Sequence, residues 1–353
     1  MNPTLTNPLQ SLGTGDTTAL AVEEFSGLVL AALPTKTKIW PHGMKHQLTQ
    51  GNSYTFEAVG KMSVQHHTPG TERAGTGQPP IEERTIPIDN EEITADAWIG
   101  RTQQDMAHFD ITPRCADEAA KAIGKRLDQL AARHIAIGAR QDERDCADGQ
   151  SLPSGNLVRR NAATVAAGYP VSKTGSSHVQ DDLAQMGQLF READIDDSVP
   201  WIAFVPPYLQ RVLLQDRSLT AKEYQDPITN NRLFGNMELV ENFRLIPTNN
   251  MPNAITYSAT EAETATAKYE KESAYHGDFT NTSILCLAGE MAFGSVLFRE
   301  IEPTGPTWHE LRRAFFIGAA SYQGTKWIRP EYCGEIYCDT DAYAVSDGVY
   351  LPV

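Results

Sequence analysis

Adjacent histidines are the first residues in this sequence whose type could support chemistry. His66 and His67 follow one another directly, and imidazole groups bind zinc when further ligands lie at helix or hairpin spacing. The neighbouring segment supplies only Glu72 and, at a greater distance, Glu82 and Glu83. We therefore expect no metal site at this pair.

His108 is the second candidate, because it lies between Asp105 and Asp110 in the segment DMAHFD. A carboxylate beside a histidine is typical of a general base, but nucleophilic catalysis also needs a Ser or Cys, and none accompanies it in the sequence. One interpretation is a cytosolic hydrolase with a site assembled in space around His108. The other is a histidine that packs or caps at a turn.

Sequence motifs of the common enzyme classes are missing from the chain. It contains no GxxxxGK[ST] phosphate loop, no GxGxxG after a strand, no GxSxG and no HExxH. We therefore predict no enzyme activity, no catalytic residue and no cofactor.

Composition restricts the partners and the compartment. The chain has 30 Lys and Arg residues and 45 Asp and Glu residues, which gives a net charge of −15. Tight DNA binding instead needs clustered cations that neutralise phosphates. The five cysteines include no close CxxC pair, which favours reduced thiols over a disulfide framework or zinc knuckle. The start of the chain has no signal-peptide pattern, and the apolar stretch 25–33 is too short for a membrane span. We expect a protein made and kept in a cytoplasm.

An arm and a ribbon are the first elements that the sequence predicts. Residues 1–50 are broken by Pro and rich in small polar residues, so they indicate an N-terminal arm. Alternating apolar residues from Ser53 predict a strand, and isoleucines from Ile81 to Ile93 predict a returning strand, with a tip rich in Gly and Pro between them. Because a two-stranded ribbon is marginal by itself in water, we expect it to lean on a neighbouring subunit.

A long helix follows, with Thr112 suited to its N-cap and Pro113 to its first position, running to Arg140. One apolar stripe at spacings of four, three, four and three marks its buried face: Ile123, Leu127, Leu130, His134 and Ile137. His134 is interpreted as a packed core histidine. At about 1.5 Å per residue the helix would be ~43 Å long, enough to support a domain.

The rest of the chain mixes helix and strand patterns. Val179, Leu183, Met186 and Phe190 form the stripe of a second helix. WIAFV at 201–205 and LFGNMELVENFRLI at 233–246 predict strands, and the last hundred residues are rich in β-branched and aromatic residues. This order predicts an α+β fold.

This order of elements resembles the major capsid proteins of tailed double-stranded DNA bacteriophages, which have the HK-97-like fold. The segments that carry the resemblance are GNSYTFEAVGKMSVQHHTPGTE, RTIPIDNEEITADAWI, DMAHFDIT, WIAFVPPYLQRVLL with LFGNMELVENFRLIP, and AFFIGAASYQGTKWIRPEYCGEIY. They are most similar to the capsid proteins of short-tailed podoviruses, in particular those that resemble autographiviruses. The resemblance covers nearly the whole chain.

The resemblance implies a division of the chain into the parts of that fold. These are an N-arm at 1–50, an extended E-loop hairpin at 51–97, a peripheral domain with the spine helix at 98–145, an axial domain with insertions at 146–290, peripheral-domain strands at 291–320 and closing strands at 321–353.

It also implies a structural subunit of an icosahedral head, located in the virion and assembled in the bacterial cytoplasm. Such subunits form pentamers and hexamers around packaged DNA without sequence-specific binding, and their partners are scaffolding, portal and decoration proteins. The alternative of another virion component, such as a decoration protein, stays open. Scaffolding proteins are more helical than this chain.

The E-loop is where the resemblance implies contacts between subunits. Some relatives also join an E-loop lysine covalently to an asparagine, but from residue 61 to residue 92 this chain has only Lys61, at the hairpin base. We therefore predict a shell without covalent cross-links. The residues expected to make E-loop contacts are Tyr54, Phe56, His66, His67, Glu72, Arg73 and Arg84.

Overall fold

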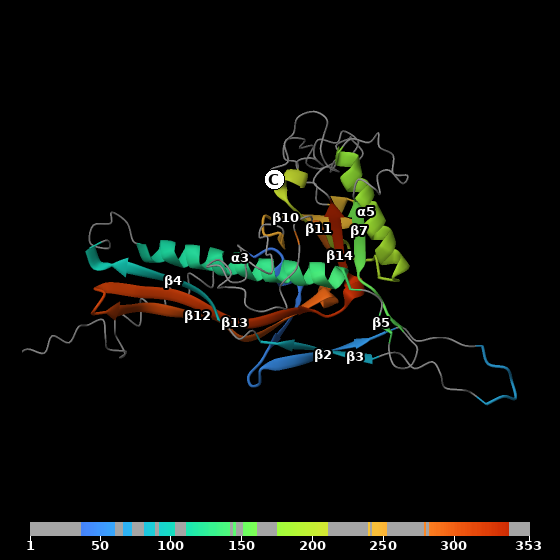
Figure 1. Cartoon of the computed structure of the whole chain (residues 1–353), viewed down its shortest axis with the longest axis horizontal. Helices are drawn as coiled ribbons and strands as arrows, with labels where there is room; N and C mark the ends of the chain where they lie inside the picture. The colour runs from blue at the N-terminus through green and yellow to red at the C-terminus, as the bar shows by residue number, and fades with distance from the viewer. Residues whose placement is uncertain are drawn as a thin grey trace, which may run out of the picture.

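The protein is an elongated α+β molecule in the computed structural model, as the element pattern predicts (Figure 1). One long helix runs along a four-stranded sheet and ends against a six-stranded sheet. The structure describes residues 37–60, 66–72, 81–88, 92–102, 111–141, 144–145, 151–160, 175–210, 239–240, 242–252, 279 and 282–338.

The four-stranded sheet has the order β1 (Met44–Gln47), β12 (Phe293–His309), β13 (Ala314–Trp327) and β4 (Ile93–Gly100). β12 and β13 form a long antiparallel hairpin, β1 lies parallel to β12, and β4 lies antiparallel to β13. Ile93, which we assigned to the returning strand of the ribbon, instead pairs with Ser321 of β13. Its period-two pattern was interpreted correctly as strand, but such a pattern does not reveal the partner strand.

The six-stranded sheet has the order β7 (Asn156–Arg160), β14 (Cys333–Cys338), β11 (Thr282–Leu287), β8 (Trp201–Val205), β10 (Phe243–Pro247) and β9 (Leu239–Val240). All six residues of β11 are buried, as befits a strand covered on both faces. The predicted strand at 201–205 is confirmed as β8.

Helix α5 (Gly175–Glu192) packs on this six-stranded sheet. The predicted apolar stripe is confirmed, since all four of its residues are fully buried, and Phe190 meets the Trp201 ring edge-on at 5.2 Å between centroids. Aromatic pairs in this geometry contribute about 1 kcal/mol beyond the area that they bury.

Helix α3 (Ile111–Ala139) is the predicted long helix, and it begins one residue before the expected N-cap Thr112. Its first half packs Ala116, Ala120, Ile123 and Leu127 against the four-stranded sheet. Its second half presents alanines and Ile135 to the six-stranded sheet. The small alanine side chains let the strands approach the helix axis closely, so one helix supports both sheets.

The ribbon consists of β2 (Ser53–Val59) and β3 (Ile81–Pro87), paired in register from Ser53 opposite Pro87 to Val59 opposite Ile81. A separate short pair, β5 (Arg144–Asp145) with β6 (Ser151–Leu152), completes the strands. One face of the ribbon is supported by its own chain, while the expected contact with a neighbouring subunit stays a prediction. Ile86 of β3 is fully buried in a cluster with Ile88, Val296 and Ile328 of the same chain, so its own sheet already supports the ribbon.

Gly324 of β13 lets the end of the ribbon approach the four-stranded sheet closely. A Cβ atom built there would lie 1.9 Å from the carbonyl oxygen of Pro87. Because this oxygen belongs to the main chain, it cannot move away by a change of side-chain rotamer. Only a residue without a side chain fits at this contact.

We expect Gly324→Ala to lower the free energy of unfolding by about 1–3 kcal/mol, the usual cost of overpacking, measured by urea denaturation. Gly289→Ala is the control, because the nearest atoms there belong to the Tyr332 ring at 3.1 and 3.3 Å and a side chain can shift. Equal stability losses in the two variants would contradict the close packing of ribbon and sheet.

Candidate assembly surface

The described part of the chain places some of the candidate chemical residues. His66, His67 and Glu72 are exposed, and His108 and Arg73 lie outside the described residues. Within the described ranges, no group of three or more His, Cys, Asp or Glu side chains is placed to hold a metal ion. Among the same residues no helix combines the length and apolarity that crossing a membrane requires.

The predicted core stripe of α3 lies as follows. Ile123, Leu127, Leu130 and His134 are buried, and Ile137 is partly buried beside the C-terminal cluster. Burial, together with the positive charges of Lys326 and Arg133, lowers the pKa of His134 to about 3. His134 is therefore neutral in the folded protein at any pH near 7.

Asp128 anchors the segment before β1 to the middle of α3. Its carboxylate accepts hydrogen bonds from the backbone N–H groups of Lys38 (2.7 Å), Ile39 (3.0 Å) and Trp40 (3.0 Å), and from the side-chain amide of Asn250 (2.9 Å). Burial raises the pKa of this carboxyl group, and the hydrogen bonds oppose that rise. Sequence patterns did not reveal this contact, which joins residues about ninety positions apart.

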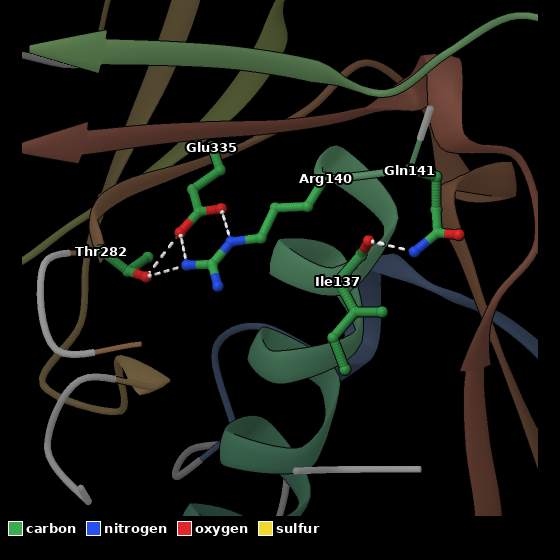
Figure 2. A network of polar contacts seen from close by, with 5 residues as sticks. All are labelled: Ile137, Arg140, Gln141, Thr282 and Glu335. Atoms are coloured by element: carbon green, nitrogen blue, oxygen red, sulfur yellow. Dashed lines mark hydrogen bonds and ion pairs between the residues drawn. The ribbon is translucent and has the colours of Figure 1, made fainter. Parts of the chain in front are cut away.

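Arg140, just beyond the end of α3, fastens the helix to the six-stranded sheet (Figure 2). Its Nε and Nη2 atoms donate to the two carboxylate oxygens of Glu335 on β14, both at 2.6 Å. The Thr282 hydroxyl donates to the same carboxylate at 2.5 Å and lies 3.3 Å from Nη2. A bidentate pair of this kind fixes direction as well as distance.

Two aromatic rings and the Gln141 side chain surround this network at the end of α3. The Arg140 guanidinium lies 5.2 Å from the Phe279 ring centroid and 5.8 Å from that of Tyr337. The Gln141 side chain turns back and donates to the Ile137 carbonyl at 3.0 Å, which satisfies one of the last helical acceptors (Figure 2). The end of α3 therefore has a single defined position on the sheet.

Three cations fasten the ribbon to the body of its own chain. The Arg84 guanidinium lies 4.0 Å from the centroid of the Trp327 ring. Lys326 Nζ donates to the Thr85 carbonyl at 3.1 Å, and Arg329 Nη2 donates to the Val59 carbonyl at 3.0 Å. Arg84 is therefore buried inside its own chain, and its expected contact with a neighbouring subunit stays a prediction.

One face of the ribbon packs on its own chain and the other face is exposed. Tyr54 and Phe56 pack on the cluster around Ile86, and His46 stacks on Tyr54 at 3.6 Å between ring centroids. Residues on the other face of both strands are exposed: Thr55, Glu57, Val59, Ile81, Glu83 and Thr85. Sequence alternation separated these faces correctly but could not show which one the chain itself covers.

A protein-family model described as Gp10A-like, major capsid protein, matches residues 56–302, well over half of the chain. The matched region contains most of the ribbon, both long helices α3 and α5, strand β4, and every strand of the six-stranded sheet except β14. The chain belongs to this major capsid protein family. It is thus a structural subunit of a viral shell, and the family favours this interpretation over a hydrolase centred on His108.

Solved capsid structures share the fold of this capsid protein. The capsid of cyanophage P-SCSP1u matches with a TM-score of 0.66 and 21% identity over 86% of this chain and 89% of that one. The mature capsid of bacteriophage PhiM1 gives 0.65 and 14% over 86% and 87%. The capsid of Ralstonia phage GP4 gives 0.53 and 14% over 86% and 92%. None of the curated protein sequences is significantly similar.

These similarities confirm the HK-97-like fold expected from the order of elements. The capsid protein is a virion component, and its shell is an oligomeric assembly of copies. With identities of 14 to 21%, these solved structures show a shared fold.

Removing one partner of the Arg140–Glu335 pair should leave a buried charge without its ion-pair partner. The Glu335 side chain is 0% exposed and that of Arg140 is 26% exposed, so we expect Arg140→Met to lower the free energy of unfolding by about 3 kcal/mol. Adding Glu335→Leu should recover part of the loss. Asp197→Asn, at the exposed 3.7 Å pair with Arg191, is the control and should cost under about 1 kcal/mol.

His134 predicts a pH dependence of stability. Its pKa is about 3 in the folded protein against 6.5 in the unfolded chain, so the unfolded state takes up a proton first as the pH falls. Stability is fully present above pH 6.5 and is lost below it, by up to about 1.4 kcal/mol per pH unit from this group. His134→Gln should flatten this part of the urea-denaturation profile, whereas His66→Gln, at an exposed site, should leave it unchanged.

Proposed function

We propose that this capsid protein assembles into pentamers and hexamers of an icosahedral phage head that encloses double-stranded DNA. The observation that carries the proposal is the ribbon, which is fastened to its own chain on one face and presents the whole other face outward. A closed shell needs such a surface on every copy, because each subunit must offer its neighbour a contact that repeats around the ring.

The division into N-arm, E-loop, peripheral domain and axial domain is part of the proposal. The four-stranded sheet with the first half of α3 corresponds to the peripheral domain, and the six-stranded sheet with α5 corresponds to the axial domain. The tip residues His66, His67 and Glu72, together with Arg73, remain the proposed E-loop contacts outside the ribbon itself.

Neighbouring subunits are held without covalent links in this proposal. Lys61 is the only lysine between residues 61 and 92, and arginine cannot replace it because its guanidinium stays protonated and is no nucleophile. Arg84 is in addition buried against Trp327.

The proposed partners are a scaffolding protein during assembly, a portal, and decoration proteins on the finished head. We place assembly in the bacterial cytoplasm and the closest relationship with short-tailed phages. The net charge of −15 supports enclosure of DNA without sequence-specific binding, since phosphates are repelled rather than neutralised. The proposal assigns the chain no catalytic activity.

Expression of the full chain, with and without a co-expressed scaffold, tests this function. We expect rapidly sedimenting capsomers, shells or tubes in negative-stain micrographs, and a single band at the subunit mass of 38.8 kDa after boiling in SDS. A small discrete oligomer under every condition would overturn the shell proposal. A ladder of linked subunits would overturn only the claim that no cross-links form.

A further inference from the structure

Two buried polar side chains use none of their hydrogen-bonding atoms within the described part of the chain. Trp40 is 4% exposed, and its indole Nε1 donor meets no acceptor there. Gln323 is 1% exposed, and neither its amide oxygen nor its amide nitrogen has a partner among the same residues. Two residues with unused hydrogen-bonding groups thus lie inside the subunit.

Polar groups of this kind are costly to bury. An amide or an indole N–H loses its hydrogen bonds to solvent on folding, and it regains them only from a partner inside the protein. For this reason nearly all buried polar groups in native proteins are bonded to protein atoms or to ordered water. The two side chains thus point to a partner that the described residues do not supply.

Trp40 and Gln323 lie on the same side of the four-stranded sheet, at Leu297 of β12. Trp40 packs in the apolar cluster that contains Leu297 and residues of the first half of α3. Gln323 of β13 is the cross-strand partner of Leu297, and side chains opposite one another in an antiparallel pair share a face, about 5 Å apart at Cβ. Both polar side chains therefore adjoin Leu297 between α3 and the sheet.

Alternation along β13 gives the same placement. Ile317 and Ala319 pack in the cluster with α3, and every second residue of a strand shares a face, so Gln323 and Thr325 face the helix as well. The Thr325 hydroxyl is hydrogen bonded to the Ser295 hydroxyl of β12 at 3.2 Å, and both residues are buried. The sheet thus presents a polar patch to α3 between its two apolar clusters.

Small neighbours leave room for a further molecule beside the Gln323 amide. Ser295, Ser321 and Thr325 have short side chains, whereas the Gln323 side chain extends through a further methylene group before its amide. The pairing of β4 with β13 ends where Ile93 lies opposite Ser321, so β12 is the only described strand that flanks Gln323. A water molecule fits such a polar space when it finds roughly two to four hydrogen-bonding partners.

We propose that ordered water binds in this space and links Trp40 to Gln323. One water molecule accepts the hydrogen bond of Trp40 Nε1 and donates, directly or through a second water, to the Gln323 amide oxygen. The hydroxyl groups of Ser295 and Thr325 line the same patch and offer further donors and acceptors. The ligand is water rather than an ion, because indole, amide and hydroxyl groups are neutral and together supply both donors and acceptors.

This hydration site supports a contact that the main chain already makes. The backbone N–H of Trp40 donates to Asp128 in the middle of α3, and the water binds the side chain of the same residue. The segment before β1 is therefore held from two directions, by the helix through Asp128 and by the sheet through water.

Replacing the Gln323 amide by an apolar side chain of similar length tests the site through the sign of the stability change. With water bound to the amide, Gln323→Met leaves that water short of a partner, so we expect the urea midpoint of the full-length protein to fall by roughly 0.3 M or more. A dry amide gives the opposite sign, because the substitution then removes an unpaired polar group. A midpoint that rises or stays would therefore overturn the proposal. Gln50→Met, at an exposed position, is the control and should leave the midpoint unchanged.

A water shared by two side chains couples their substitutions. Trp40→Phe should also lower the midpoint, and we expect Trp40→Phe combined with Gln323→Met to lose less than the sum of the two single changes, since both remove the same water. Strictly additive losses would contradict the link between the two residues.

A density map of the parent chain that resolves ordered water gives a readout independent of any variant. We expect a peak about 3 Å from Trp40 Nε1 that continues to the Gln323 amide. Direct apolar contact at both groups, with no peak between them, would refute the site.

Discussion

The contact of α3 with both sheets is the constraint on which the rest of the structure depends. Alanines and branched residues on its first half pack against the four-stranded sheet. Alanines and Ile135 on its second half pack against the six-stranded sheet. A helix is stiff over this length, so the angle between the sheets is set by side-chain packing along one rod rather than by a linker.

Buried polar groups add direction to that apolar contact. Asp128, in the middle of α3, accepts hydrogen bonds from three main-chain N–H groups of the segment before β1. Arg140, at the end of the helix, binds Glu335 of β14 through a bidentate pair. Apolar packing tolerates small sliding because it is not directional, whereas these hydrogen bonds are satisfied in one register only. The polar anchors thus convert a packed helix into a positioned one.

Periodicity was sufficient to predict α3, α5, the ribbon and the α+β class, because one-sided burial leaves a repeat in the sequence. It could not show that Ile93 pairs with β13, nor that Tyr54 and Arg84 face their own chain, since alternation has no information about what covers a face. The Asp128 and Arg140 networks were also missed. They join residues far apart in the chain and leave no local pattern.

Two of the three cations that fasten the ribbon bind its main chain. Lys326 and Arg329 donate hydrogen bonds to the backbone carbonyl oxygens of Thr85 and Val59. Substitutions at the outward positions therefore leave the attachment intact. The ribbon can diverge rapidly in sequence to follow changes in whatever it meets, while its placement on the subunit is inherited unchanged.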